Sequence, residues 1–182
     1  MVDIRYSQNF YRKKSKLNDL IKKANIRSKD IVIDIGAGKG NITKQLGKYA
    51  KRVMAYEFDP KYFHKLEREL RQHENISIIN DDFLQASLPS SSFKVFSNIP
   101  FSLTSDIVSK ITDEESKLEE AFIFVQKEAS YRYIGYPKNT QISAILSFRY
   151  KIEIFEKLRR EDFSPVPSVD IVVLKLSQKD CG

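Results

Sequence analysis

The segment Ile31-Val-Ile-Asp-Ile-Gly-Ala-Gly-Lys-Gly40 decides the fold. A short run rich in β-branched residues ends in alternating glycines, which is typical of a strand followed by a tight turn. Glycine permits positive φ there and lets the backbone approach a ligand closely. Residues 41–49 then predict a helix, because Ile42, Leu46 and Tyr49 fall on one face. This order of strand, turn and helix opens an α/β sheet.

The same alternation continues along the chain. The predicted strands are 31–35, 53–56, 76–79, 93–97, 121–125, 152–158 and 171–176. The predicted helices are 15–25 with Ser15 as its cap, 41–49, 60–72, 104–112 and 127–134. We therefore expect one α/β domain over residues 1–182, with a doubly wound, mostly parallel seven-stranded sheet.

Composition restricts the class of protein further. Apolar residues make up 41% of the 182-residue chain, enough for a buried core. The longest apolar run, Ala121 to Val125, is far too short to span a membrane, and the N-terminus lacks the apolar core of a secretion signal. The single cysteine, Cys181, permits no internal disulfide and no cysteine-based metal site. These features predict a cytoplasmic protein without membrane contact or a structural metal.

The positive charge is concentrated at one end of the sequence. Residues 1–29 hold nine Lys or Arg against two Asp, which equals the whole net charge of +7. A basic segment on a neutral body favours docking to a polyanion, although a solvated helix face explains it equally well. Tyr6, Phe10 and Tyr11 lie among these charges, where they suit either base stacking or core packing.

Ligands of open α/β sheets bind at the carboxyl ends of strands. Glu57 follows the second predicted strand, 21 residues after Gly36, where a carboxylate can accept hydrogen bonds from both ribose hydroxyls. The glycine spacing is G-x-G-x-G, and Asn41 stands where the dinucleotide fingerprint requires glycine, which disfavours an oxidoreductase. The pattern indicates an adenosine-containing cofactor, but it does not by itself separate NAD from S-adenosylmethionine.

The next two strand ends also carry polar and aromatic residues. Asp82 can accept from the exocyclic amine of an adenine and Phe83 can pack on its ring, although solvated loop carboxylates are the alternative. The tetrapeptide Asn98-Ile99-Pro100-Phe101 follows the fourth strand. It supplies the Asn98 side-chain carbonyl, the backbone carbonyls of Ile99 and Pro100, and an aromatic face for a planar base. Such a loop suits the amino group of a base.

With these motifs the sequence resembles the ribosomal RNA adenine N6-methyltransferases, the family of the Erm macrolide-resistance enzymes and the KsgA-type dimethyltransferases. The matching segments are Ser7-Gln-Asn-Phe10, Asp34–Gly40, Glu57, Asp82-Phe83, Asn98–Phe101 and Phe163-Ser-Pro-Val-Pro167, with 169–176 as the last strand. Gly-Lys-Gly and Asn-Ile-Pro-Phe are closer to the Erm branch than to the KsgA branch, which tends toward Gly-Pro-Gly and Asn-Leu-Pro-Tyr. Members usually carry a small helical C-terminal domain, which we expect to be absent from this chain ending at Gly182.

The resemblance implies a class I S-adenosylmethionine-dependent methyltransferase with a Rossmann-like fold. It implies that Asn9 and Tyr11 close over the cofactor, Gly36 lines its methionine side, Glu57 binds its ribose, and Asp82 with Phe83 binds its adenine. Asn98 would bridge the cofactor and the target amine within a catalytic loop that includes Pro100 and Phe101, and Phe101 with Phe163 would hold a flipped adenine. Lys13, Lys14 and Lys16 are expected to contact the RNA backbone.

The implied activity is N6-methylation of an adenine in 23S rRNA by a monomer, giving protection against macrolide, lincosamide and streptogramin B antibiotics. The alternatives are a 16S rRNA adenine dimethyltransferase, a DNA adenine methyltransferase, and an RNA-binding module with a vestigial cofactor pocket. No general base is expected, because both histidines, His64 and His73, fall outside the motifs and are predicted to lie on the surface.

Overall fold

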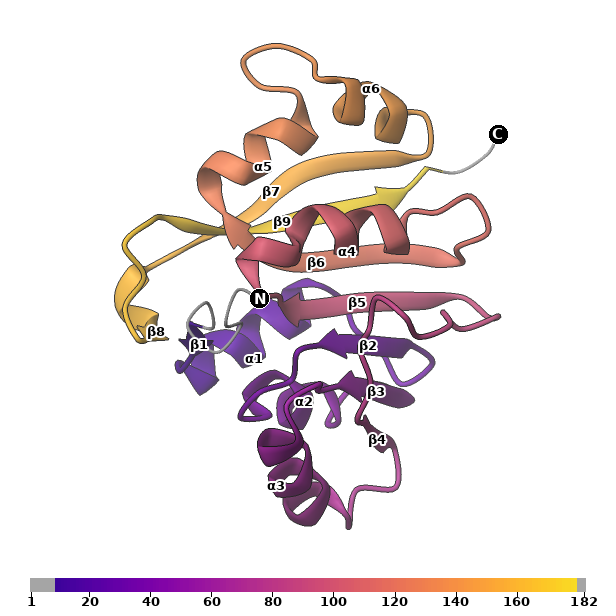
Figure 1. Cartoon of the computed structure of the whole chain (residues 1–182), viewed down its shortest axis with the longest axis vertical. Coiled ribbons are helices and arrows are strands. Elements are labelled where there is room, and N and C mark those ends of the chain that lie inside the picture. The colour runs from indigo at the N-terminus through magenta and orange to yellow at the C-terminus, as the bar shows by residue number, and fades with distance from the viewer. Residues whose placement is uncertain (1–8, 180–182) are drawn as a thin grey trace.

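Seven strands form one sheet in the order β4, β3, β2, β5, β6, β9, β7 (Figure 1). The computed structural model describes residues 9–179. The first five strands in this order, β4, β3, β2, β5 and β6, run parallel to one another, whereas β9 is antiparallel to both of its neighbours. The strands are β2 (Ile31–Ile35), β3 (Arg52–Tyr56), β4 (Ile76–Ile79), β5 (Phe93–Asn98), β6 (Leu118–Gln126), β7 (Tyr150–Leu158) and β9 (Ile171–Gln178).

Helices cover both faces of this sheet. One face carries α1 (Lys14–Lys23), α2 (Asn41–Leu46) and α3 (Pro60–Leu70), and the other carries α4 (Thr104–Ile111), α5 (Lys127–Ile134) and α6 (Gln141–Ser147). Short 3-10 helices, η2 (Phe101–Leu103) and η3 (Arg160–Asp162), follow β5 and β7. The prediction of a doubly wound, mostly parallel seven-stranded sheet is therefore confirmed.

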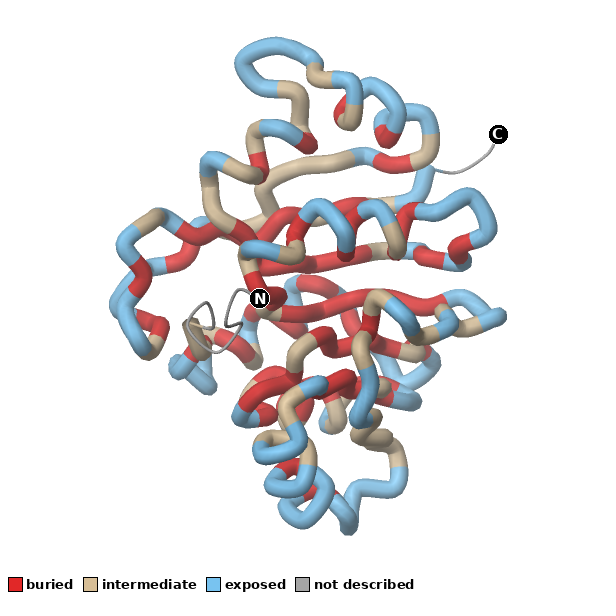
Figure 2. The backbone as a smooth tube through the Cα atoms, in the orientation of Figure 1, coloured by how far each residue is buried: buried red, intermediate tan, exposed pale blue. Residues whose placement is uncertain are grey.

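Alternating strand residues build two cores, because successive side chains of a strand point to opposite faces. Ile33 and Ile35 pack on the α4 side, whereas Val32 packs on the α1 and α2 side. Figure 2 shows the buried residues concentrated along the central strands. The second core contains an aromatic cluster in which Phe124 meets Phe96 with ring centroids 5.9 Å apart.

A two-residue ladder lies outside the main sheet and holds the N-terminal segment in place. Strand β1 (Phe10–Tyr11) pairs antiparallel with β8 (Phe163–Ser164), and Figure 1 shows the two beside the carboxyl ends of the parallel strands. Just beyond it, the Arg12 amide donates to the Asp162 carbonyl at 2.7 Å. Asn41 Nδ2 donates to the Tyr11 carbonyl at 2.9 Å. The start of the described chain is thereby tied to the turn after β2.

The differences from prediction occur where local sequence signals are weak. Helix α6 was missed because its cap is Thr140 paired with Ser143, without the acidic residue that marks most capping boxes. The β1–β8 ladder joins segments far apart in the sequence, so no local pattern indicates it. Ser15 as the cap of the first helix is wrong, because α1 begins at Lys14 and Lys13 occupies the cap position without a side-chain bond.

No described helix is both long enough and apolar enough to cross a membrane.

The aromatic cluster gives a first test of the fold. We expect Phe124→Ala to lower the free energy of unfolding by about 3–5 kcal/mol, because it opens a cavity in a fully buried core. Phe148→Ala removes a ring that is 85% exposed and should change it by less than about 0.5 kcal/mol. Equal effects in chemical denaturation would contradict this assignment of the core.

Candidate active site

The glycine turn after β2 is bent by three positive φ angles, 70° at Gly36, 54° at Gly38 and 74° at Gly40. The amides of Gly36 and Ala37 both donate to the Tyr56 carbonyl, at 2.8 and 3.0 Å, and so hold the turn against the end of β3. A Cβ at Gly38 would stand 2.5 Å from Phe10 Cε1. Glycine is therefore required there for Phe10 to lie against the turn.

Glu57 is a buried carboxylate at the end of β3. Its Oε2 accepts from the Gly38 amide at 2.7 Å and its Oε1 from the Asp59 amide at 2.8 Å. Burial raises the pKa of Glu57, and the two amide donors partly oppose that effect. Each oxygen keeps a further lone pair, so the carboxylate can still accept hydrogen bonds from a ligand.

A second group of residues follows the ends of β3 and β4. Asn80 Nδ2 donates to the Glu57 carbonyl at 2.8 Å, and half-buried Asp82 accepts the Leu84 amide at 2.9 Å. Phe83 is buried, with its ring edge-on to Tyr56, and offers little free surface. The exposed ring in this group belongs to Phe58, 67% exposed, which the sequence analysis missed. The sequence did carry a signal for Phe58, because an aromatic residue directly after the acid that ends a strand is not expected to pack in the hydrophobic core.

A narrow pocket opens between the ends of β2 and β5. It brings together five of the predicted site residues, Asn9, Tyr11, Gly36, Asn98 and Phe101. Glu57, Asp82 and Phe83 do not line it. The hydrogen bond from the Gly38 amide to Glu57 connects the two groups. Ser7 and Gln8 of the predicted N-terminal motif, like Tyr6, lie outside the described residues.

The Asn98 loop presents acceptors to this pocket. Asn98 Nδ2 donates to the Asn9 carbonyl, which orients the amide. Among the described residues, none donates to Asn98 Oδ1 or to the Ile99 carbonyl. The Pro100 carbonyl accepts the Leu103 amide at 3.0 Å where η2 closes, and its second lone pair stays available. Of the two expected backbone acceptors, the Ile99 carbonyl is thus the one with no donor among the described residues.

The two predicted base-stacking residues differ in exposure. Phe101 is half-buried and borders the pocket. Phe163 is completely buried, 5.1 Å from the ring of Tyr11 and 6.4 Å from that of Phe124. Phe163 therefore presents no free face in this structure, and its contacts instead support Tyr11 beneath the N-terminal segment.

The three predicted RNA-contacting lysines are also unequal. Lys13 and Lys14 are exposed at the start of α1. Lys16 is only partly exposed, and its ammonium lies 3.9 Å from the Asp162 carboxylate. Its charge is partly balanced within the protein, which leaves Lys13 and Lys14 as the better candidates for contact with a polyanion.

Asp34 is a buried acid that the sequence motif did not single out. It lines the pocket, and its Oδ2 accepts the Thr43 hydroxyl at 2.7 Å. Burial raises the pKa of Asp34 to about 7, although hydrogen bonds from Thr43 and Ser97 oppose the rise. The sequence did indicate that Asp34 is buried, since a strand residue inside an apolar run usually is.

The fold is that of Rossmann-like methyltransferases, and comparison with known proteins identifies the family. Residues 2–181 match the family model "Ribosomal RNA adenine dimethylase", and the chain belongs to that family. Members act as rRNA adenine N6-methyltransferases, and this chain is one of them.

Two curated relatives have similar identity but different names. Ribosomal RNA small subunit methyltransferase A of Aster yellows witches'-broom phytoplasma (strain AYWB) is 36% identical, over 97% of this chain and 69% of the relative. The rRNA adenine N-6-methyltransferase of Limosilactobacillus reuteri is 34% identical, over 95% of this chain and 71% of the relative. Sequence identity alone therefore does not separate the two branches of the family.

Two solved structures are similar to this chain over most of its length. A 23S rRNA methyltransferase, ErmE, superposes with a TM-score of 0.88 at 31% identity, covering 94% of this chain and 70% of that one. A dimethyladenosine transferase from Plasmodium falciparum gives 0.83 at 25% identity, covering 94% and 64%. The recognition made from sequence motifs is confirmed at the level of the family.

Tyr11 offers a test of whether its hydroxyl serves the fold. This group is buried and makes no hydrogen bond of normal geometry with the described residues. We expect Tyr11→Phe to raise the free energy of unfolding by up to about 1 kcal/mol, because a buried hydroxyl with no such bond to the described residues is no longer desolvated. Tyr133→Phe is the control and should be destabilising, since that hydroxyl contacts Ser105 Oγ at 3.4 Å. A loss of stability in Tyr11→Phe would contradict the assignment.

Asp34 predicts a pH dependence of stability. Between its ordinary pKa of 3.8 and about 7, folded Asp34 keeps a proton that the unfolded chain has lost. The associated stability is complete at acid pH and is lost as the pH rises through about 7. The free energy of unfolding of the parent minus that of Asp34→Asn should therefore fall between pH 5 and 8. A difference that stays constant over this pH range would refute the assignment.

Proposed function

We propose that this protein transfers the methyl group of S-adenosylmethionine to N6 of an adenine in 23S rRNA, and thereby protects ribosomes from macrolide, lincosamide and streptogramin B antibiotics. The observation that carries the proposal is a pair of acceptors to which no described residue donates, Asn98 Oδ1 and the Ile99 carbonyl, beside the glycine turn. The Gly-Lys-Gly turn, the Asn-Ile-Pro-Phe loop and the close superposition on a 23S enzyme favour this target. Methylation of 16S rRNA is the alternative, supported by the small-subunit relatives.

The residues present fit S-adenosylmethionine, which supplies a sulfonium-bound methyl group and a good leaving group. Glu57 would accept the ribose hydroxyls with the lone pairs that its two amide donors leave free. The exposed Phe58 ring provides a stacking face for the adenine, and Asp82 provides a carboxylate for its amine. The glycine turn at Gly36 leaves room for the methionine part along the pocket.

The target amine needs positioning more than proton transfer. An adenine amine is a poor nucleophile, because its lone pair is delocalised into the ring. Acceptors at Asn98 Oδ1 and the Ile99 carbonyl would draw its two N–H groups out of the ring plane and favour tetrahedral nitrogen. Phe101 would hold the base against the pocket after it has flipped out of its RNA. Orientation of this kind is worth about 7–11 kcal/mol in favourable cases.

The N-terminal segment connects this chemistry to RNA binding. Residues 9–11 line the pocket, and exposed Lys13 and Lys14 follow directly at the start of α1. RNA phosphates drawn to these lysines would lie near the mouth through which an adenine must enter. We further expect the protein to be cytoplasmic. We also expect a monomer, because one chain supplies every residue of the proposed site.

Glu57 tests the cofactor assignment. We expect Glu57→Ala to weaken S-adenosylmethionine binding by about 1.5–3 kcal/mol, because the ribose hydroxyls lose a charged acceptor. Isothermal titration measures this directly, with circular dichroism to verify folding. Glu74→Ala, at an exposed position after α3, is the matched control and should bind as the parent does. Unchanged affinity in Glu57→Ala would remove this residue from the site.

Asn98 tests the role of the acceptor loop. Asn98→Ala should lower the single-turnover rate of methyl transfer by at least about tenfold while changing cofactor affinity much less, because its carbonyl acts on the amine as the transition state forms. Asn139→Ala, in the exposed loop before α6, should leave both quantities unchanged. If rate and cofactor affinity fall by the same factor, Asn98 merely shapes the pocket.

The target is tested by incubating the protein with radiolabelled S-adenosylmethionine and separate transcripts of 16S and 23S rRNA, followed by primer extension. The proposal predicts label in N6-methylated adenine of the 23S transcript. Label in 16S rRNA alone would establish the alternative, and label in neither would overturn the proposal for protein-free RNA.

A further inference from the structure

A second hollow adjoins the active-site pocket and has no role in the mechanism above. It has a volume of about 410 Å³ and is lined by Phe10, Arg12, Lys39, Asn41 and Ser164. Three of these residues, Phe10, Lys39 and Asn41, also line the active-site pocket, so the two spaces are neighbours. Two of the lining residues are cationic and none of the described ones is acidic.

Lys39 is held at this boundary by its surroundings. It lies between Gly38 and Gly40, whose positive φ angles fix the path of the turn. Its ammonium lies over the Phe10 ring, 4.8 Å from the centroid, and Phe10 itself packs against Gly38. A cation over an aromatic face is stabilised by about 0.5–1 kcal/mol at an exposed site. The Lys39 charge is therefore positioned by the ring rather than by an acidic partner among the described residues.

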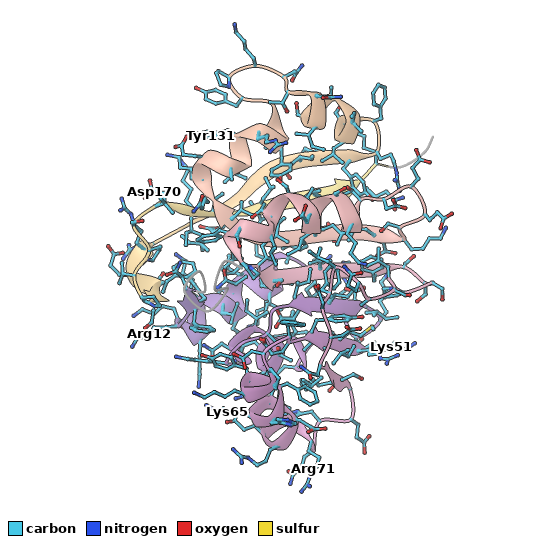
Figure 3. The ribbon with its side chains drawn as sticks, viewed as in Figure 1. Arg12, Lys51, Lys65, Arg71, Tyr131 and Asp170 are labelled. Atoms are coloured by element: carbon cyan, nitrogen blue, oxygen red, sulfur yellow. The ribbon has the colours of Figure 1, made fainter. Side chains whose placement is uncertain are left out.

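Arg12 reaches the same hollow from a different part of the chain. Its backbone amide donates to the Asp162 carbonyl, which anchors its main chain where β1 ends. Its side chain is exposed and projects at the edge of the molecule beside β1 (Figure 3). Besides these two cations, the polar residues Asn41 and Ser164 line the hollow. Guanidinium, ammonium and neutral hydrogen-bonding groups together are the donors that bind phosphate oxygens.

We propose that this hollow binds a phosphodiester of the RNA strand next to the target adenosine, with Arg12 and Lys39 as its two positive contacts. A base that enters the active-site pocket leaves its backbone at the rim, and this hollow is the adjoining space. Arg12 and Lys39 thus become positioning residues that fix where along the strand an adenosine is flipped. The inference rests on the proposed function.

The test measures binding of a fluorescent 12-nucleotide oligoadenylate over a range of salt concentrations. Each lost phosphate contact should reduce the slope of log affinity against log salt by about 0.7 for single-stranded RNA. The variant Arg12→Gln/Lys39→Gln should therefore flatten the slope by about 1.4. Its KM for methylatable rRNA should rise at least about tenfold, with a much smaller change in kcat at saturating RNA.

The matched control is Lys51→Gln/Arg71→Gln, which also removes one lysine and one arginine. Lys51 directly precedes β3, at the opposite end of that strand from the site, and Arg71 ends α3; Figure 3 shows both far from Arg12. The control should keep the parental slope.

Two outcomes would overturn the inference. The first is a double variant with the parental slope; if its S-adenosylmethionine binding is weakened as well, Lys39 is assigned to the cofactor carboxylate. The second is a control whose slope falls as far as that of the double variant. Failure of the proposed function is recognised separately, because the parent would then bind no S-adenosylmethionine or methylate no rRNA.

Discussion

The hydrogen bond from the Gly38 amide to Glu57 Oε2, 2.7 Å long, is the interaction on which the site depends. A buried carboxylate is costly unless it is hydrogen-bonded, and this bond satisfies Glu57 while joining the ends of β2 and β3. The amide makes this bond from a turn with a positive φ at Gly38. The same missing Cβ lets Phe10 pack on the turn and brings the N-terminal segment to Asn98. One glycine thus positions three parts of the site.

The residues proposed to act on the target amine are hydrogen-bond acceptors and an aromatic ring rather than proton-transfer groups. Asn98 and Ile99 line the pocket beside the glycine turn, whereas Glu57, which accepts the Gly38 amide, does not line it. Such a division suits a reaction between two bound molecules, one carrying a reactive cation and the other a weak amine nucleophile. Orientation and desolvation then provide most of the rate enhancement, so the absence of histidine from the motifs is consistent with the chemistry.

Sequence patterns predicted the parts of the structure that are local. Residues 31–35 and 76–79 are strands as predicted, since β-branched runs bounded by turn residues carry their own signal. The motif residues Gly36 and Asn98 meet in one pocket because parallel strands end at the same edge.

Features that depend on tertiary packing could not be predicted in the same way. The burial of Phe163 depends on the β1–β8 ladder, and the hydrogen bond that the Pro100 carbonyl accepts depends on how η2 closes. The most direct test of the whole account is hydrogen–deuterium exchange with and without saturating S-adenosylmethionine. The account predicts slower exchange at residues 36–40, 57–59, 80–83 and 97–101, with α6 unchanged. Protection confined to α5, α6 and β7, or none at saturation, would contradict it.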